Sequence, residues 1–262
     1  MIKAVFFDVD GTLLSHESKQ VPLSTRKALD LLKEKGIKRV LATGRHMSEL
    51  KVLPVSDITF DGYLMMNGQL CLDEKGNVLF AHPIVGHSKD LLLKAFEEKK
   101  MPIMLLAKDK MYINFNNEYV EYAQKSISTP MPEIGNYSGE DIYQVIPYVS
   151  EEKGKELFDK LTDCEVTRWN KYAYDIFASG GGKAKGIEQY IKLYGIDKSE
   201  TMAFGDGEND VEMLNYVHIG IAMGNGEDIV KENADHVTTS VDEDGIMNGL
   251  VHFGILSDNL QY

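Results

Sequence analysis

Two carboxylates follow an apolar run at the start of the chain. Residues 2–7 are apolar apart from Lys3 and rich in β-branched and aromatic side chains, which is typical of a buried strand in a parallel sheet. Asp8 ends the run and Asp10 follows two residues later, so both carboxylates point to the same side if the backbone stays extended. Like charges at the mouth of a sheet repel, and a cation or a proton must relieve them. The stretch therefore indicates a chemical site on a parallel-sheet fold.

The same residues also suit a simple turn, because Asp and Gly are common where a strand ends. Three later stretches favour the site. Each is placed where an open α/β sheet binds its ligands, just beyond the carboxyl end of a strand. They are Thr43-Gly44-Arg45, Lys183 after a glycine cluster, and the run 205–210 with sequence Gly-Asp-Gly-Glu-Asn-Asp.

Strands and helices alternate at both ends of the chain, and the pattern changes in the middle. An amphipathic helix with Ser24 as its N-cap precedes a strand that delivers Thr43, which predicts the βαβ unit of a parallel sheet. Hairpins and helices within residues 82–181 predict an inserted α+β domain, and the glycines at 180–182 mark either a hinge or a flexible turn. We expect an α/β fold with a doubly wound, Rossmann-like parallel-sheet core formed by residues 1–81 and 182–262.

Charge and cysteine content narrow the class of protein. The 262-residue chain has a formal net charge of −13, which disfavours a nucleic-acid partner but not a small phosphorylated substrate. Cys71 and Cys164 lack metal-ligand spacing and are too few for a disulfide scaffold, so reduced thiols are expected. We find no signal-peptide pattern and no apolar run long enough to span a bilayer. The sequence predicts a cytoplasmic protein without a membrane partner.

The motifs together resemble those of haloacid dehalogenase (HAD) superfamily phosphatases, in particular the Cof-type sugar-phosphate phosphatases with a large α/β (C2-type) cap. The resemblance covers nearly the whole core, whereas the middle region matches chiefly in length and element order, and it implies that residues 82–181 form the cap. The matching stretches are residues 8–12, 42–45, Lys183 and 205–210 as the four motifs, with 222–225 and 242–245 resembling later stretches.

One position departs from the family pattern. The third-motif Lys is often followed by Gly, but this chain has Ala184, and Lys185 is followed by Gly186. Lys185 is therefore an alternative third-motif residue. We prefer Lys183, because this frame places Ile187 and Ile191 on the core-facing side of the helix.

The resemblance implies a phosphoric monoester hydrolase that uses Mg²⁺. Asp8 is the implied nucleophile, which forms an aspartyl-phosphate, and Asp10 the implied general acid and then general base. Thr43 and Lys183 would bind and neutralise the phosphoryl oxygens. The implied metal ligands are the carboxylates of Asp8 and Asp206 and the backbone carbonyl of Asp10.

Several roles have alternatives. Asp210 is either an acidic partner of the metal site, through water or Lys183, or a first-turn helix acid. Asn209 either supports ligand binding or caps a helix. Arg45 either clamps phosphate or is a solvated or structural residue. Gly11, Thr12 and Gly44 are candidate phosphate-binding residues, although the first two also suit a turn.

The implied partner is a small-molecule phosphate ester, and a cap that covers its own active site favours a monomer. A phosphomutase or a nucleotide or cofactor phosphatase on the same core is an alternative. A phosphate-accepting receiver-like signalling domain also uses clustered Asp, Thr and Lys on a doubly wound sheet, but motif order and length disfavour it. An inactive sugar-phosphate binding protein is disfavoured because all the expected charged groups are present.

Overall fold

The computed structural model of the chain describes residues 1–127 and 129–257, which form two compact units. Unit 1 comprises Met1–Arg45, Leu50–Phe80 and the chain from Gly182 onward, and unit 2 comprises His46–Glu49 and Ala81–Gly181. Each unit contains one sheet, and the two sheets differ in strand direction. None of the helices in the described ranges combines the length and apolar character needed to cross a membrane.

The sheet of unit 1 has eight strands within the described residues, in the order β13-β12-β11-β1-β2-β3-β4-β5. Neighbours from β13 to β3 pair in parallel, whereas β3 and β4 are antiparallel. The elements of this unit are β1 (Ala4–Phe7), α1 (Leu23–Glu34), β2 (Lys38–Ala42), β3 (Gly62–Met65), β4 (Leu70–Asp73), β5 (Val78–Ala81), α6 (Lys183–Tyr194), β11 (Thr201–Gly205), α7 (Val211–Tyr216), β12 (Ile219–Ala222), α8 (Asp228–Glu232), β13 (His236–Val237) and α9 (Gly245–His252), with the short α2 (Met47–Leu50) where the chain passes between units.

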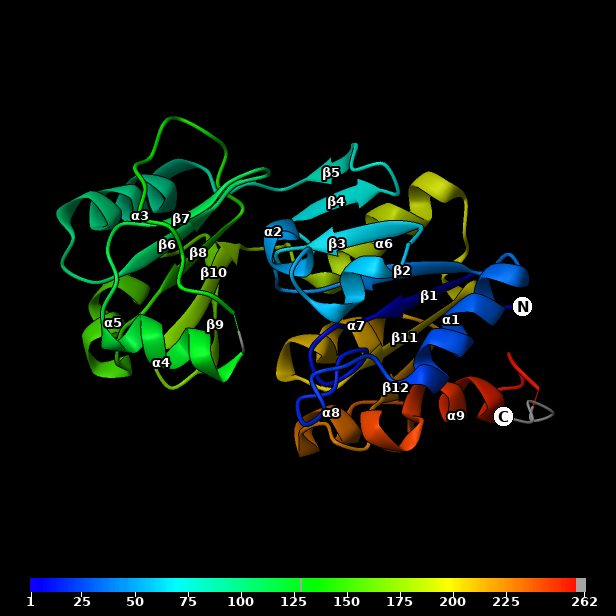
Figure 1. Cartoon of the computed structure of the whole chain (residues 1–262). Coiled ribbons are helices and arrows are strands. Elements are labelled where there is room, and N and C mark those ends of the chain that lie inside the picture. The colour runs from blue at the N-terminus through cyan, green and yellow to red at the C-terminus, as the bar shows by residue number, and fades with distance from the viewer. Residues whose placement is uncertain (128, 258–262) are drawn as a thin grey trace. The chain divides into compact units, whose positions relative to one another are not determined.

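Helices cover both faces of this sheet. On one face, α6, α7 and α8 pack on alternate strand residues such as Phe6 and Val40, all of them buried. On the other face lie α1 and α9, side by side in Figure 1. Gly249 of α9 lies against the ring of Phe204, and that ring stacks on Phe7 at 5.6 Å between centroids. The predicted doubly wound α/β core is confirmed.

The start of α1 differs from the sequence-based prediction. Pro22 occupies the N-cap position, and Ser24 lies inside the first turn with its side chain buried. The prediction that Ser24 caps the helix is therefore wrong. The fixed φ of proline suits the entry to a helix and lets the helix begin at Leu23.

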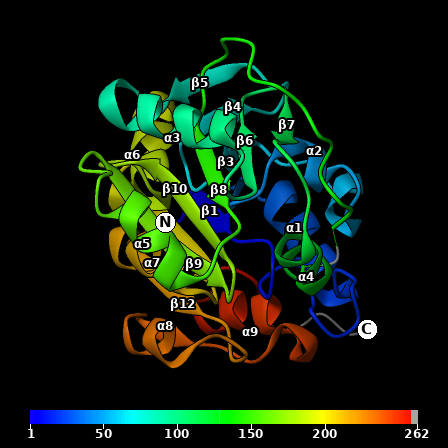
Figure 2. The ribbon, with the colours of Figure 1, turned by 90° about the vertical axis from the view of Figure 1, so that its left-hand side faces the viewer.

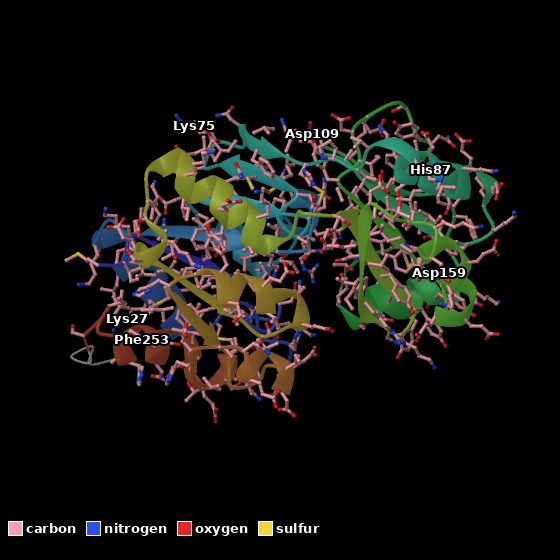
Figure 3. The ribbon with its side chains drawn as sticks, turned by 180° about the vertical axis from the view of Figure 1, so that it is seen from behind. Lys27, Lys75, His87, Asp109, Asp159 and Phe253 are labelled. Carbon is pink, nitrogen blue, oxygen red and sulfur yellow. The ribbon has the colours of Figure 1, made fainter. Side chains whose placement is uncertain are left out.

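The sheet of unit 2 has the strand order β7-β6-β8-β10-β9, and its paired strands are antiparallel. Two helices, α3 and α5, lie on one side of this sheet in Figures 1 and 2, where their apolar residues join the core. Figure 3 labels Lys75 at the turn between β4 and β5, and Asp109 at the turn between β6 and β7. The elements of unit 2 are α3 (Gly86–Glu98), β6 (Ile103–Leu106), β7 (Met111–Ile113), α4 (Glu118–Ser126), β8 (Gln144–Pro147), α5 (Glu151–Phe158), β9 (Cys164–Asn170) and β10 (Ala173–Ala178).

Candidate active site

Three of the motifs lie at the same edge of the unit 1 sheet. Strand β1 lies between β2 and β11 and is parallel to both, as Figure 1 shows. From β1 the chain builds the sheet outward through β2 and β3, and later returns on the opposite side of β1 with β11. This reversal is the switch point at which open α/β sheets bind ligands beyond the carboxyl ends of their strands. Asp8, Thr43 and Asp206 each follow one of these adjacent strands.

A buried ammonium group joins two of the acidic residues. Lys183 Nζ lies 2.6 Å from Asp8 Oδ1 and 2.6 Å from Asp210 Oδ1, and the Lys183 side chain is 0% exposed. Lys185 instead pairs with Glu188 on the exposed side of α6. The structure therefore brings Lys183, and not Lys185, to the site.

Three carboxylates converge around this ammonium. Asp8, Asp206 and Asp210 each offer an oxygen, and these oxygens lie within 4.8 Å of one another. Burial raises the pKa of Asp8 to about 7 against the lowering effect of Lys183, and the charges of Asp210 and Asp10 add to the rise. Burial and the neighbouring carboxylates of Asp8 and Asp210 likewise raise the pKa of Asp206 to about 8. The three oxygens are donors of the kind that hard divalent cations prefer.

Asp210 also shapes the loop that carries Asp206. Its Oδ2 accepts hydrogen bonds from the backbone N–H groups of Asp206 at 3.0 Å and Gly207 at 3.1 Å, while Oδ1 pairs with Lys183. Asp210 is fully buried and stands immediately before α7. Asp210 therefore contacts Lys183, and its role as an acidic partner of a metal site stays a prediction.

The turn after β1 brings Gly11 against Asp206. Gly11 has φ +82°, and a Cβ built on it would lie 2.1 Å from Asp206 Oδ2, so a side chain there meets both steric and backbone strain. Thr12 Oγ1 donates to Asp206 Oδ1 at 2.7 Å. The backbone N–H of Gly11 donates to Leu14 O at 2.9 Å, which describes a turn. Phosphate binding by Gly11 and Thr12 stays a prediction.

The loop after β2 contains Thr43, Gly44 and Arg45. Thr43 is buried, and its Oγ1 accepts the backbone N–H of Arg45 at 3.1 Å. The Arg45 guanidinium binds Asp10 through two hydrogen bonds, Nε to Oδ2 at 2.6 Å and Nη2 to Oδ1 at 2.8 Å. Because Arg45 is only 6% exposed, its interpretation as a solvated residue is wrong. Gly44 is half-buried between them, and phosphate binding by Thr43 and Gly44 stays a prediction.

Sequence reasoning gave no role to Asn67, which follows β3 at the same edge. Asn67 has φ +54° and is buried, a conformation that asparagine tolerates better than most residues. Its N–H donates to Thr43 O at 2.9 Å, and its Oδ1 accepts from Asn209 Nδ2 at 3.1 Å. Asn209 lies between the cap positions Gly207 and Asp210, so its interpretation as a helix cap is wrong. The Asn-Gly pair after β3 was the available sequence signal.

Comparison with known proteins places this geometry in a family. The family model described as haloacid dehalogenase-like hydrolase matches residues 5–250. Among curated proteins, the chain is 34% identical over 258 residues to the protein named "Putative phosphatase YkrA" of Bacillus subtilis, and the alignment covers 97% of this chain and 98% of that protein.

Two solved structures are similar over nearly the whole chain. One is BT1666 from Bacteroides thetaiotaomicron, described among phosphatases of the HAD superfamily, with 32% identity, a TM-score of 0.88 and coverage of 98% of this chain and 96% of that chain. The other is the HAD subclass IIB sugar phosphatase BT4131, with 35% identity, a TM-score of 0.87 and coverage of 97% and 100%.

Proposed function

The chain belongs to the haloacid dehalogenase-like hydrolase family and is a phosphatase of it, and from this premise we propose that it hydrolyses small phosphate monoesters, chiefly sugar phosphates, through an aspartyl-phosphate at Asp8. Mg²⁺ is the proposed cofactor. The observation that carries the proposal is the buried Lys183 ammonium, 2.6 Å from Asp8 Oδ1 at the switch point of the sheet. The carboxylate of Asp8, as the nucleophile, would lie beside a fixed positive charge that can bind the oxygens of the phosphoryl group.

The charge of the cluster supports a divalent cation. Asp8, Asp206 and Asp210 contribute three negative charges when ionised, and Lys183 contributes one positive charge, which leaves two negative charges in a buried place. Burial raises the pKa of Asp8 and of Asp206, and the neighbouring carboxylates raise both further. We assign Mg²⁺ to the carboxylates of Asp8 and Asp206 and the carbonyl of Asp10, where it would stabilise charge on the phosphoryl oxygens.

The proposed reaction has two steps that use the same side chains. First, an oxygen of Asp8 bonds to phosphorus while the bond from phosphorus to the ester oxygen breaks, and Asp10 gives its proton to that oxygen. Next, a water oxygen bonds to phosphorus as Asp10 takes the water proton and the bond to Asp8 breaks. Lys183 and Thr43 hold the phosphoryl oxygens in both steps.

We assign substrate selection to residues 82–181 of unit 2, as a cap that excludes water from the reaction. The sugar phosphatase BT4131 is similar over 97% of this chain, which supports sugar phosphates as the substrate class. The net charge of −13 is compatible with a small anionic substrate, because the local positive charge of Lys183 suffices for one phosphoryl group.

The purified protein should hydrolyse p-nitrophenyl phosphate with Mg²⁺ and lose this activity in EDTA. Asp8→Asn should abolish turnover while leaving the fold intact by circular dichroism. The matched control is Asp57→Asn, since the Asp57 side chain is 66% exposed and pairs only with Arg26 among the salt bridges of the described chain. Turnover that survives Asp8→Asn refutes the nucleophile assignment.

A panel of hexose, pentose and nucleotide phosphates tests the substrate class. We expect the highest kcat/KM for a sugar phosphate. A clear preference for nucleotides, or transfer of the phosphoryl group between positions of one sugar, contradicts this part of the proposal and favours the nucleotide phosphatase or phosphomutase alternative.

A further inference from the structure

Arg45 makes a two-pronged contact with Asp10 that the proposed reaction has not used. Its guanidinium reaches both carboxylate oxygens of Asp10, at 2.6 and 2.8 Å. The side chains are 7% and 30% exposed, so the pair is shielded from water on the arginine side. Charge-assisted, two-pronged bonds of this kind are stronger and more directional than neutral ones.

The backbone of Arg45 is fixed on both sides of this contact. Its N–H donates to Thr43 Oγ1 at 3.1 Å, and its carbonyl accepts the N–H of Met66 at 3.3 Å. Met66 has φ +51° and follows β3, so the loops after two neighbouring strands hold the arginine. A guanidinium anchored in this way determines where the Asp10 carboxylate points.

We propose that Arg45 is a positioning residue for Asp10, which orients its carboxylate for proton transfer to the ester oxygen. This inference rests on the proposed function. A carboxylate has about four acceptor positions, and Arg45 uses one on each oxygen. The remaining positions can hold the proton that Asp10 gives to the leaving group, and later accept the proton of the water. When Asp10 gives up its proton, the adjacent guanidinium stabilises the negative charge that develops, with little reorganisation.

The same geometry argues against a phosphate clamp through the contacting edge of Arg45. Nε and Nη2 form one edge of the guanidinium that can bind an oxyanion in a two-pronged manner, and Asp10 occupies this edge. A phosphoryl group would have to displace Asp10 to bind there. Positioning of Asp10 and binding of phosphate therefore predict different losses of kcat/KM for different substrates when Arg45 is replaced.

The experiment compares kcat/KM for two esters that carry the same phosphoryl group. p-Nitrophenolate leaves without a proton, whereas the alkoxide of a sugar phosphate needs one. For Arg45→Ala we expect kcat/KM to fall about 100-fold on the sugar phosphate and less than about 5-fold on p-nitrophenyl phosphate, because general acid catalysis contributes about 10²–10⁴-fold. Arg45→Lys keeps the charge but not the planar fork, and should give an intermediate ratio.

The matched control is Arg39→Ala. Arg39 is also a buried arginine, in β2, and pairs with Asp61 at 3.3 Å at the other end of that strand. Its loss should leave the ratio of the two kcat/KM values unchanged, whatever it does to stability. In an Asp10→Asn background, Arg45→Ala should cause no further selective loss, since the arginine acts through Asp10.

Each outcome decides the proposal. The proposal is supported if Arg45→Ala lowers kcat/KM selectively on the sugar phosphate and this selectivity disappears in the Asp10→Asn background. If Arg45→Ala does not fold, the same comparison is made with Arg45→Lys. An equal fall on both esters overturns it in favour of phosphate binding, and an unchanged ratio overturns it in favour of a structural role. If the wild-type protein with Mg²⁺ hydrolyses neither ester, the proposed function fails with it; if it hydrolyses both, a failed ratio refutes only the role of Arg45.

Discussion

Lys183→Met removes the only positive side chain recorded in contact with Asp8 and Asp210 among the described residues. The ammonium is fully buried, and its loss leaves carboxylates within 4.8 Å of one another in a place that water hardly reaches. Removing one partner of a buried ion pair costs about 3–5 kcal/mol. Domains of ordinary stability unfold with about 5–15 kcal/mol. We therefore expect the variant to lose roughly a fifth or more of its stability.

Urea unfolding in EDTA at pH 8 measures this cost without a contribution from bound metal. A lower midpoint at an unchanged slope reports a loss of stability and not a change in compactness. The loss should shrink at pH 5.5, because protons then neutralise carboxyl groups such as Asp206, whose pKa is raised to about 8 by burial and neighbouring charge. The double variant with Asp210→Asn should lose about 0.5–3 kcal/mol less than the sum of the single variants, since the two groups are in contact.

Lys185→Met is the matched control in the same helix. Lys185 pairs with Glu188, and its side chain is 38% exposed, so its removal should cost no more than about 1 kcal/mol. If Lys183→Met and Lys185→Met unfold at the same urea concentration in EDTA at pH 8, the buried ammonium does not offset the acidic cluster, and the electrostatic reasoning is refuted.

Further substitutions test the metal site and unit 2. Gly11→Ala should cost about 1–2 kcal/mol through its positive φ and raise the Mg²⁺ concentration for half-maximal activity, because the Cβ would displace Asp206; unchanged Mg²⁺ dependence contradicts this. Asp206→Asn should fold but stay inactive at every Mg²⁺ concentration, and full rescue by excess Mg²⁺ would exclude Asp206 as a ligand. Burial opposes ionisation of Glu140, but hydrogen bonds from Tyr112 and Ser138 lower its pKa to about 2. Its stabilising effect is therefore present above its ordinary pKa of 4.5 and lost as pH falls toward 2, so the urea midpoints of wild type and Glu140→Gln should differ at pH 7 and converge on acidification; a constant gap refutes this.

The positions of the motifs could be predicted from the sequence because strand order and strand polarity decide them. An apolar run followed by Asp8, and another followed by Thr43, end at one edge once the strands are parallel, and parallel pairing follows from the helix between them. The sequence also separated the hairpin-rich middle of the chain from its βα ends. These inferences depend on periodicity and on the order of elements, which are properties of the chain itself.

Contacts between loops could not be predicted in the same way. Arg45 with Asp10, and Asn67 with Asn209, join residues 35 and 142 positions apart in the chain. Such pairs depend on rotamers and on the path of each loop, which hydrophobic periodicity does not encode. The same limit explains the error at α1, where either Pro22 or Ser24 suits a helix start locally and the packing of the first turn decides between them.

The choice of Lys183 over Lys185 is a case in which the periodicity of a helix predicts a residue of the site. Lys183, Ile187 and Ile191 are four residues apart and share one helix face, and both isoleucines are buried in the core of unit 1. A lysine on that face at the first turn of α6 must also be buried, so it requires acidic partners nearby. Lys185 points about 200° around the helix from Lys183 and is partly exposed. The face of α6 that packs onto the sheet therefore also places the ammonium of Lys183 beside Asp8.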